Sequence, residues 1–138
     1  MNQTFRDFEF VIVEDPSTTE AADLLKRFDD PRIRHIRNEA RTGLIAQRNR
    51  TLAEARADLV ALLDADDLMQ PHRLAEQVKF LTDHPDTAVL GCQLIVIDGD
   101  GREIGTRAYP TSHDAILRAM PRYDAIPQPG VLARKAAM

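Results

Sequence analysis

Three aspartates that close an apolar stretch are the residues of this sequence best suited to chemistry. Asp64, Asp66 and Asp67 follow the run Leu59–Leu63 in the segment LVALLDADD. Carboxylates this close repel one another, and a hard cation that takes up their charge makes the cluster tolerable. Oxygen ligands alone select Mg²⁺ or Mn²⁺. The pattern predicts a metal site that handles phosphate, although acids after a strand can also simply start a turn and cap the next helix.

The apolar run before these aspartates predicts a buried strand. An unbroken apolar stretch that follows a helix-like segment, here Leu44–Arg56, is typical of a strand covered on both faces of a parallel sheet. In open α/β sheets, ligands bind beyond the carboxyl ends of the strands. We therefore expect the three aspartates to face a crevice.

The composition is that of an acidic globular domain. The 138 residues carry 22 acidic and 18 basic side chains, a net charge of -4, which argues against binding to nucleic acid or to an anionic membrane. The only cysteine, Cys92, lies in an apolar run and is expected to be a buried, unreactive thiol. Neither a secretion signal nor an apolar run of about 20 residues is found. We expect a single cytoplasmic domain, residues 1–138.

Strand-like and helix-like segments alternate along the chain. Ser17 and Glu20 form a capping box, Asp98–Gly101 predicts a hairpin turn, and the residues after Met120 are expected to be mostly loop. This alternation predicts an α/β fold with a largely parallel sheet. The predicted strands are Phe8–Val13, Arg32–Arg37, Leu59–Leu63, Ala88–Ile97 and Arg102–Ala108, and the predicted helices follow Ser17, Gly43, Pro71 and Ser112.

Two of the predicted strands end in acids, at Glu14-Asp15 and at Asp64, and we expect these acids to lie at the same edge of one parallel sheet. A response-regulator receiver domain has a similar pattern around its Mg²⁺ and phosphorylation site. That resemblance is short. A receiver needs a hydroxyl residue after the next strand and a lysine before a proline further on, whereas here Lys135 is followed by Ala136. The receiver domain is therefore the less favoured alternative.

A second set of motifs runs nearly from end to end. Its segments are Gln3-Thr4-Phe5, Val13–Thr18, Arg37-Asn38, Thr42–Leu44, Gln47–Asn49, Leu63–Asp67, Pro71, Arg73-Leu74, Gln77, Pro129–Leu132 and Arg134-Lys135. In this combination the chain resembles a family 2 glycosyltransferase. The resemblance implies a GT-A-like, Rossmann-like α/β fold, with a mostly parallel sheet and flanking helices, that transfers a sugar with inversion from a nucleotide-diphosphate donor to an acceptor the sequence does not identify.

The resemblance also implies roles for individual residues. Asp15 would hydrogen-bond the nucleotide base, although an acid at that position also suits a plain helix N-terminal turn. Arg48 would approach phosphate or lie on the surface. The DxD motif would hold Mn²⁺ or Mg²⁺ against the diphosphate. The predicted nucleotide-sugar ligands are Glu14, Asp15, Arg48 and Asp66, and the predicted metal ligands are Asp64, Asp66 and Asp67.

The chain departs from the family pattern in two ways. The family's first strand, which normally lies between the strands predicted at Phe8–Val13 and Leu59–Leu63, is missing, and so is the acidic segment that supplies the general base. We therefore expect an incomplete domain without an assigned catalytic base, for which Asp124 is the nearest but disfavoured candidate. Unpaired strand edges predict self-association. The alternative to an enzyme is a non-catalytic remnant that binds nucleotide and metal.

Overall fold

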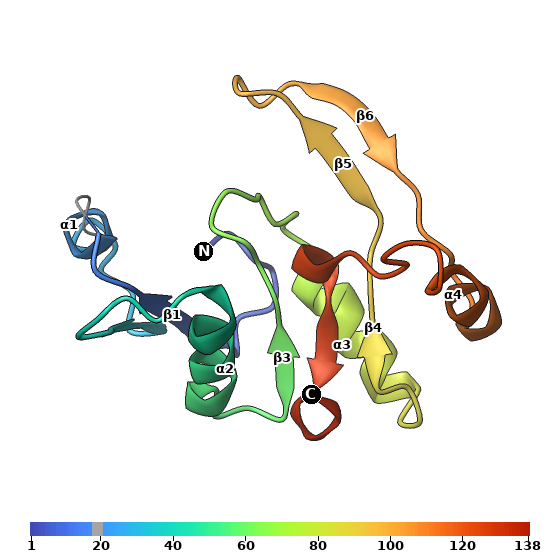
Figure 1. Ribbon diagram of the computed structural model, residues 1–138, viewed down its shortest axis with the longest axis horizontal. Coiled ribbons are helices and arrows are strands. Elements are labelled where there is room, and N and C mark those ends of the chain that lie inside the picture. The colour runs from blue at the N-terminus through green and yellow to red at the C-terminus, as the bar shows by residue number, and fades with distance from the viewer. Residues whose placement is uncertain (18–20) are drawn as a thin grey trace. The chain divides into compact units, whose positions relative to one another are not determined.

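The computed structural model in Figure 1 describes residues 1–17 and 21–138. Glu20 of the predicted capping box lies outside the described residues. The chain divides into two compact units, one of residues 6–57 and one of residues 1–5 with 58–138. The prediction of a single domain is not tested by this division, and each unit is described by itself.

The unit of residues 6–57 contains a parallel pair of strands with two helices. Its FVIVE strand is rich in β-branched residues, which suit a half-buried pleated surface. The chain crosses from β1 through α1 to β2, and the two strands pair in parallel over their full length. The elements are β1 (Phe10–Glu14), α1 (Ala21–Leu25), β2 (Ile33–Arg37) and α2 (Leu44–Glu54).

Both helices of this unit are less buried than their sequence patterns predict. Phe28 continues the helical spacing of the apolar residues Leu24 and Leu25, but α1 ends at Leu25, and the Phe28 side chain is 55% exposed. In α2, Ile45 shares its predicted helix face with Leu52 and Ala55, yet its side chain is 78% exposed. The helix begins directly after Gly43, whose φ of 82° lies in the left-handed region that glycine adopts without strain.

The unit of residues 1–5 and 58–138 is built on a three-stranded antiparallel sheet. Its order is β3-β7-β4, so β7 lies in the middle and pairs with both neighbours. Helix α3 (Arg73–Asp83) turns Leu74, Gln77 and Leu81 inward, and Figure 1 shows it beside β4 and β7. The strands are β3 (Leu59–Ala61), β4 (Val89–Leu90) and β7 (Leu132–Arg134).

The strand β7 corrects the prediction that the chain is mostly loop after Met120. Val131, Leu132 and Ala133 are only 8%, 2% and 1% exposed, which makes them part of the core. The short 3₁₀ helix Gln128–Gly130 leads into this strand, and a second one, Lys135–Ala137, follows it. The prediction failed because an apolar run of only three residues, between Pro129-Gly130 and two basic residues, carries no strand periodicity.

The strand predicted at Ala88–Ile97 is in fact two strands in different sheets. After β4 the chain leaves the core sheet, and β5 (Leu94–Ile97) pairs antiparallel with β6 (Glu103–Arg107) in a hairpin. The predicted turn is confirmed, with Gly101 at a φ of 80°. The predicted helix after Ser112 is confirmed as α4 (His113–Ala119), and the Ser112 side chain caps it.

The predicted α/β class is confirmed, but the sheet arrangement differs in detail. Among the described strands, parallel pairing occurs between β1 and β2, whereas β3 and β4 each pair antiparallel with β7. β1 and β3, which were predicted to share one sheet, belong to separate sheets. Asp15 and Asp64 lie in different units, so the prediction that they share one sheet edge stays a prediction.

Candidate functional site

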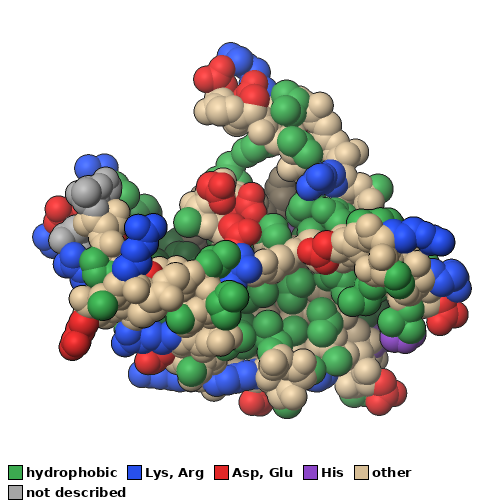
Figure 2. All heavy atoms as spheres, in the orientation of Figure 1, with side chains coloured by type: hydrophobic (Ala, Val, Ile, Leu, Met, Phe, Trp, Pro, Cys, Tyr) green, Lys and Arg blue, Asp and Glu red, His purple; other side chains and the backbone are tan. Residues whose placement is uncertain are grey.

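The loop after β3 carries the three aspartates of the DADD segment. Figure 2 shows acidic side chains gathered over this loop. The Asp67 N–H donates to the Asp64 carbonyl at 3.2 Å, which closes a turn. Partial desolvation, followed by the charges of Asp66 and Asp64, raises the pKa of Asp67, and Arg73 only partly offsets this rise. The loop therefore concentrates negative charge that a bound cation would relieve.

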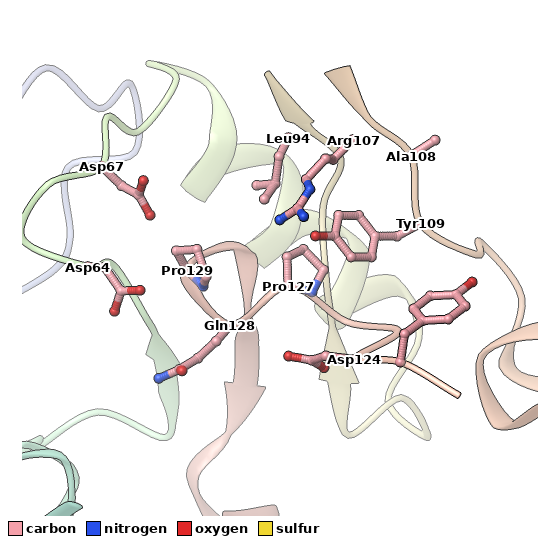
Figure 3. Close-up of a pocket in the computed structure, with 11 residues that line it drawn as sticks. Asp64, Asp67, Leu94, Arg107, Ala108, Tyr109, Asp124, Pro127, Gln128 and Pro129 are labelled. Carbon is pink, nitrogen blue, oxygen red and sulfur yellow. The ribbon is translucent and has the colours of Figure 1, made fainter. Parts of the chain in front are cut away.

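A pocket of about 770 Å³ opens beside this loop. Figure 3 shows Asp64 and Asp67 on one side of it and Asp124, Arg107 and Tyr109 on the other. An acidic wall thus faces, across the pocket, a second wall that carries an arginine, a tyrosine and an aspartate. The remaining lining residues are Leu94, Ala108, Tyr123, Pro127, Gln128 and Pro129.

The three predicted metal ligands do not together form a complete coordination site. Among the residues that the structure describes, no group of three or more His, Cys, Asp or Glu side chains is placed to hold a metal ion. Asp64 and Asp67 line the pocket, whereas Asp66 is not among its lining residues. Mg²⁺ sites that use substrate phosphates need only one or two carboxylates from the protein. The donor set thus fits a cation of that type, and the three-ligand assignment stays a prediction.

Arg73 positions both walls of the pocket. Its guanidinium donates to the carbonyls of Pro129 at 2.5 Å, Val131 at 3.0 Å and Leu62 at 3.1 Å. Desolvation lowers the pKa of this arginine. From the next turn of α3, Gln77 donates to the Gly130 carbonyl at 2.9 Å. The helix therefore ties the segment before β7 to the end of β3, where the aspartates begin.

Two glycines allow the segment before β7 to pack closely against the link between β4 and β5. A Cβ added to Gly130 would lie 2.8 Å from the Cys92 sulfur, and one added to Gly91 would lie 2.9 Å from Ile126. Contacts this short are not tolerated without movement, so the chain before β7 lies directly against the link between β4 and β5. Cys92 is a free thiol that is half-buried, where a buried one was expected.

Asp15, predicted to bind the nucleotide base, holds a turn of its own unit. Its Oδ1 accepts from the Asn38 amide at 2.6 Å and the Thr42 hydroxyl at 2.9 Å, and its Oδ2 accepts from the N–H groups of Thr42 and Gly43, both at 2.9 Å. A carboxylate offers about four acceptor positions, and these bonds use all of them. Desolvation raises the pKa of Asp15, but the hydrogen bonds outweigh it and hold that pKa well below its ordinary value.

Glu14 is likewise engaged within its unit. Its carboxylate accepts from the Ala21 N–H at 2.8 Å and lies 2.8 Å from the His35 ring. The bond from Ala21 is the main reason why the pKa of Glu14 is lowered. Arg48 is half-buried on α2, and Arg50 of the same helix donates to Asn38. The proposed nucleotide-binding roles of Glu14, Asp15, Arg48 and Asp66 stay predictions.

Comparison with known proteins assigns the family. The sequence model of glycosyl transferase family 2 matches residues 1–132, which include the DADD segment, the pocket and β7's first residue. The chain belongs to glycosyl transferase family 2. This family has a GT-A, Rossmann-like α/β fold, with which the alternating elements and the parallel β1–β2 pair are consistent. The receiver-domain alternative is therefore rejected.

Individual relatives within the family are considerably longer than this chain. An uncharacterized glycosyltransferase of Methanocaldococcus jannaschii is 39% identical over 103 residues, covering 72% of this chain and 36% of that protein. EpsE of Bacillus subtilis, named as a glycosyltransferase, is 31% identical over 137 residues, covering 97% of this chain and 44% of that protein. The glucosyltransferase WfaP of Escherichia coli is 31% identical over 81 residues, covering 59% and 32% of the two chains. This family 2 chain thus spans less than half the length of these relatives.

Sequence reasoning missed part of the pocket lining. Arg107 and Tyr109 line it, yet they lie in a hairpin strand and the loop after it, with no motif to mark them. Asp124, which was disfavoured as a catalytic base, lines the same pocket as Asp64 and Asp67. No helix in the described part of the chain has both the length and the apolar character needed to cross a membrane.

Proposed function

We propose that this chain binds a nucleotide-diphosphate sugar with Mn²⁺ or Mg²⁺ and contributes the donor side of an inverting glycosyl transfer. Membership of family 2 supports the reaction class. The observation that carries the proposal is the placement of Asp64 and Asp67 on one wall of a pocket whose opposite wall includes Arg107 and Tyr109. The full name of the relative WfaP specifies a UDP-glucose donor, which is a donor of the proposed class.

Within this proposal, the aspartates after β3 hold the cation. Asp64 and Asp67 would supply one or two carboxylates, and Asp66, whose charge raises the pKa of Asp67, would add to the attraction. A bound divalent cation neutralises the charge that develops on the diphosphate as the sugar leaves. Arg73 keeps the start of this loop in place through its bond to the Leu62 carbonyl.

In the acidic turn after β1, Asp15 would contribute to nucleotide binding indirectly, and not as a direct ligand. Asp15 keeps the turn at Thr42-Gly43 in place. A direct bond from the nucleotide base to Asp15 would have to displace one of its present donors. We therefore propose that Asp15 acts on the nucleotide indirectly, by positioning the turn at Thr42-Gly43. Glu14, Arg48 and Asp66 stay predicted nucleotide ligands.

Thermal melts with Mn²⁺, UDP and both together test the proposal. Mn²⁺ with UDP should raise the melting temperature more than either alone, because binding to the folded state stabilises it by about 2.7 kcal/mol at a hundredfold excess over the dissociation constant. Asp67→Asn should abolish the Mn²⁺-dependent part and leave the ligand-free melting temperature unchanged or higher, since it removes charge repulsion.

Asp86→Asn provides the control, because Asp86 is an exposed aspartate outside the pocket lining. It should respond to Mn²⁺ and UDP as the wild type does. Equal stabilisation of the wild type and Asp67→Asn would count against a metal site here. Stabilisation without sugar transfer to any tested acceptor would instead favour the non-catalytic nucleotide-binding alternative.

A further inference from the structure

The pocket beside the aspartates is lined by a positively charged side chain, Arg107, to which the proposed function gives no role. Among the described residues that line the pocket, Arg107 is the one basic side chain, and three aspartates line it too. Figure 3 shows its guanidinium directed into the pocket and the hydroxyl end of Tyr109 turned toward it. The two side chains therefore present hydrogen-bond donors to the same space.

Within the part of the chain that the structure describes, the Arg107 side chain has no ion-pair partner. No ion pair or hydrogen bond joins its side chain to any residue of the described ranges, Asp124 of the same pocket included. Arg102, on the other side of the hairpin, differs because its guanidinium binds Asp100 at 2.6 Å. A guanidinium offers five N–H donors in a planar fork that matches the oxygens of a phosphate or carboxylate.

The wall that carries Arg107 is held in place by its own hydrogen bonds. Arg107 pairs with Leu94 in the β5–β6 ladder. The Gln93 side chain binds the Tyr109 backbone twice, accepting from its N–H at 2.6 Å and donating to its carbonyl at 3.1 Å. These two hydrogen bonds between Gln93 and Tyr109 close the open end of the β5–β6 hairpin. Arg107 and Tyr109 are thus presented by a braced segment.

We propose that Arg107 and Tyr109 form a subsite for an oxyanion of a sugar substrate, either a phosphate or a carboxylate. This inference rests on the proposed function, because it assumes that sugars enter this pocket. The guanidinium binds two oxygens of the anion, and the tyrosine hydroxyl donates to one of them. The oxyanion is supplied by the donor diphosphate or by an acidic group on the acceptor sugar.

Binding of small sugars without metal tests the subsite separately from donor binding. Glucose 6-phosphate, glucuronate and glucose are titrated into the 138-residue chain, followed by NMR, including the side-chain Nε–H signal of Arg107. Both charged sugars should bind more tightly than glucose and shift the Arg107 signal. Arg107→Gln should weaken their binding about tenfold or more, whereas Arg102→Gln should leave it unchanged.

UDP and inorganic pyrophosphate, also titrated without metal, identify the source of the anion. If the binding of UDP and pyrophosphate is also weakened in Arg107→Gln, the subsite takes the donor diphosphate. If these two bind equally well to the wild type and to Arg107→Gln, while the charged sugars do not, the subsite takes an acidic acceptor. Equal binding of glucose and glucose 6-phosphate, equal losses in both arginine variants, or an unmoved Arg107 signal in the wild type would overturn the proposal. Because no metal is added, failure of Mn²⁺-dependent donor binding leaves these results interpretable.

Discussion

At the scale of single residues, the acids predicted to form the site include two whose pKa is lowered and one whose pKa is raised. Asp15 and Glu14 have lowered pKa values because hydrogen bonds within the chain stabilise their charged forms. Asp67 has a raised pKa because partial desolvation and neighbouring aspartates oppose its charge. The first two stabilise the fold as anions, whereas Asp67 carries a cost that a bound cation would remove.

Asp15→Asn should lower the melting temperature at neutral pH. The amide keeps one acceptor oxygen, but its NH₂ group then faces donors from the turn at Thr42-Gly43. Because the folded pKa of Asp15 lies below its ordinary value of 3.8, its stabilisation is complete above that value and is lost as the pH falls toward the folded pKa. Melts at pH 7 and about pH 3 should therefore show a difference that narrows on acidification.

Asp7→Asn is the matched control, since Asp7 is exposed and outside this network. Its melting temperature should stay close to that of the wild type at both pH values. A loss of stability in Asp15→Asn that is the same at both pH values would show that the carboxylate charge is not what holds the turn.

At the scale of elements, α3 is the part that organises the pocket. Arg73→Met should destabilise the protein by about 3 kcal/mol, because three carbonyl groups lose a charged donor. Urea unfolding measures this change. Lys79→Met on the same helix should change stability by less than about 1 kcal/mol, since Lys79 forms an exposed pair with Asp83. Similar effects of the two substitutions would contradict the role given to Arg73.

The close packing at Gly130 gives a second test at this scale. Gly130→Ala should cost about 1–3 kcal/mol, because its Cβ would lie 2.8 Å from the Cys92 sulfur. Gly99→Ala should be nearly neutral, since a Cβ there meets nothing within 4 Å. Urea unfolding of the double variant Gly130→Ala with Cys92→Ala should recover part of the loss. If it recovers none, another contact limits this site.

The helices were largely predictable from the sequence, whereas the core strand was not. Pro71 with Leu74 and Leu81 at helical spacing predicted α3 to within two residues of its start. β7 escaped prediction because its strand character comes from two flanking partners and not from its own pattern. The same reason explains why Ala88–Ile97 was read as one strand, since its two halves pair with different partners.

At the scale of the whole molecule, the motif residues of the site could be predicted and the walls around them could not. Asp64 and Asp67 were identified by residue type and spacing, and they do line a pocket. Arg107, Tyr109 and Asp124 reach that pocket only through the fold of the hairpin and of the chain before β7. Short motifs record local chemistry, while a pocket wall depends on contacts between distant segments.

Stability should be unevenly distributed over the molecule. Amide hydrogens of β7 should exchange slowest, because this strand is paired on both sides and Leu132 and Ala133 are nearly inaccessible. Those of the β5–β6 hairpin should exchange fastest among the strands, since Ile95, Val96, Ile97 and Ile104 remain 36–65% exposed. Exchange measured by NMR or mass spectrometry compares them directly. Equal protection of the two elements would contradict this ranking.

The central position of β7 also has a consequence during synthesis. Its ladder joins Leu59 to Arg134 and Val89 to Ala133, so β3 and β4 leave the ribosome well before the strand that lies between them. Until then both present unpaired amides and carbonyls to other chains. Closing such long loops is also slow. The nascent chain therefore passes through an interval in which the segment Asp64–Asp67 is already made but the sheet that holds it is not yet formed. A chaperone would protect the chain most during this interval.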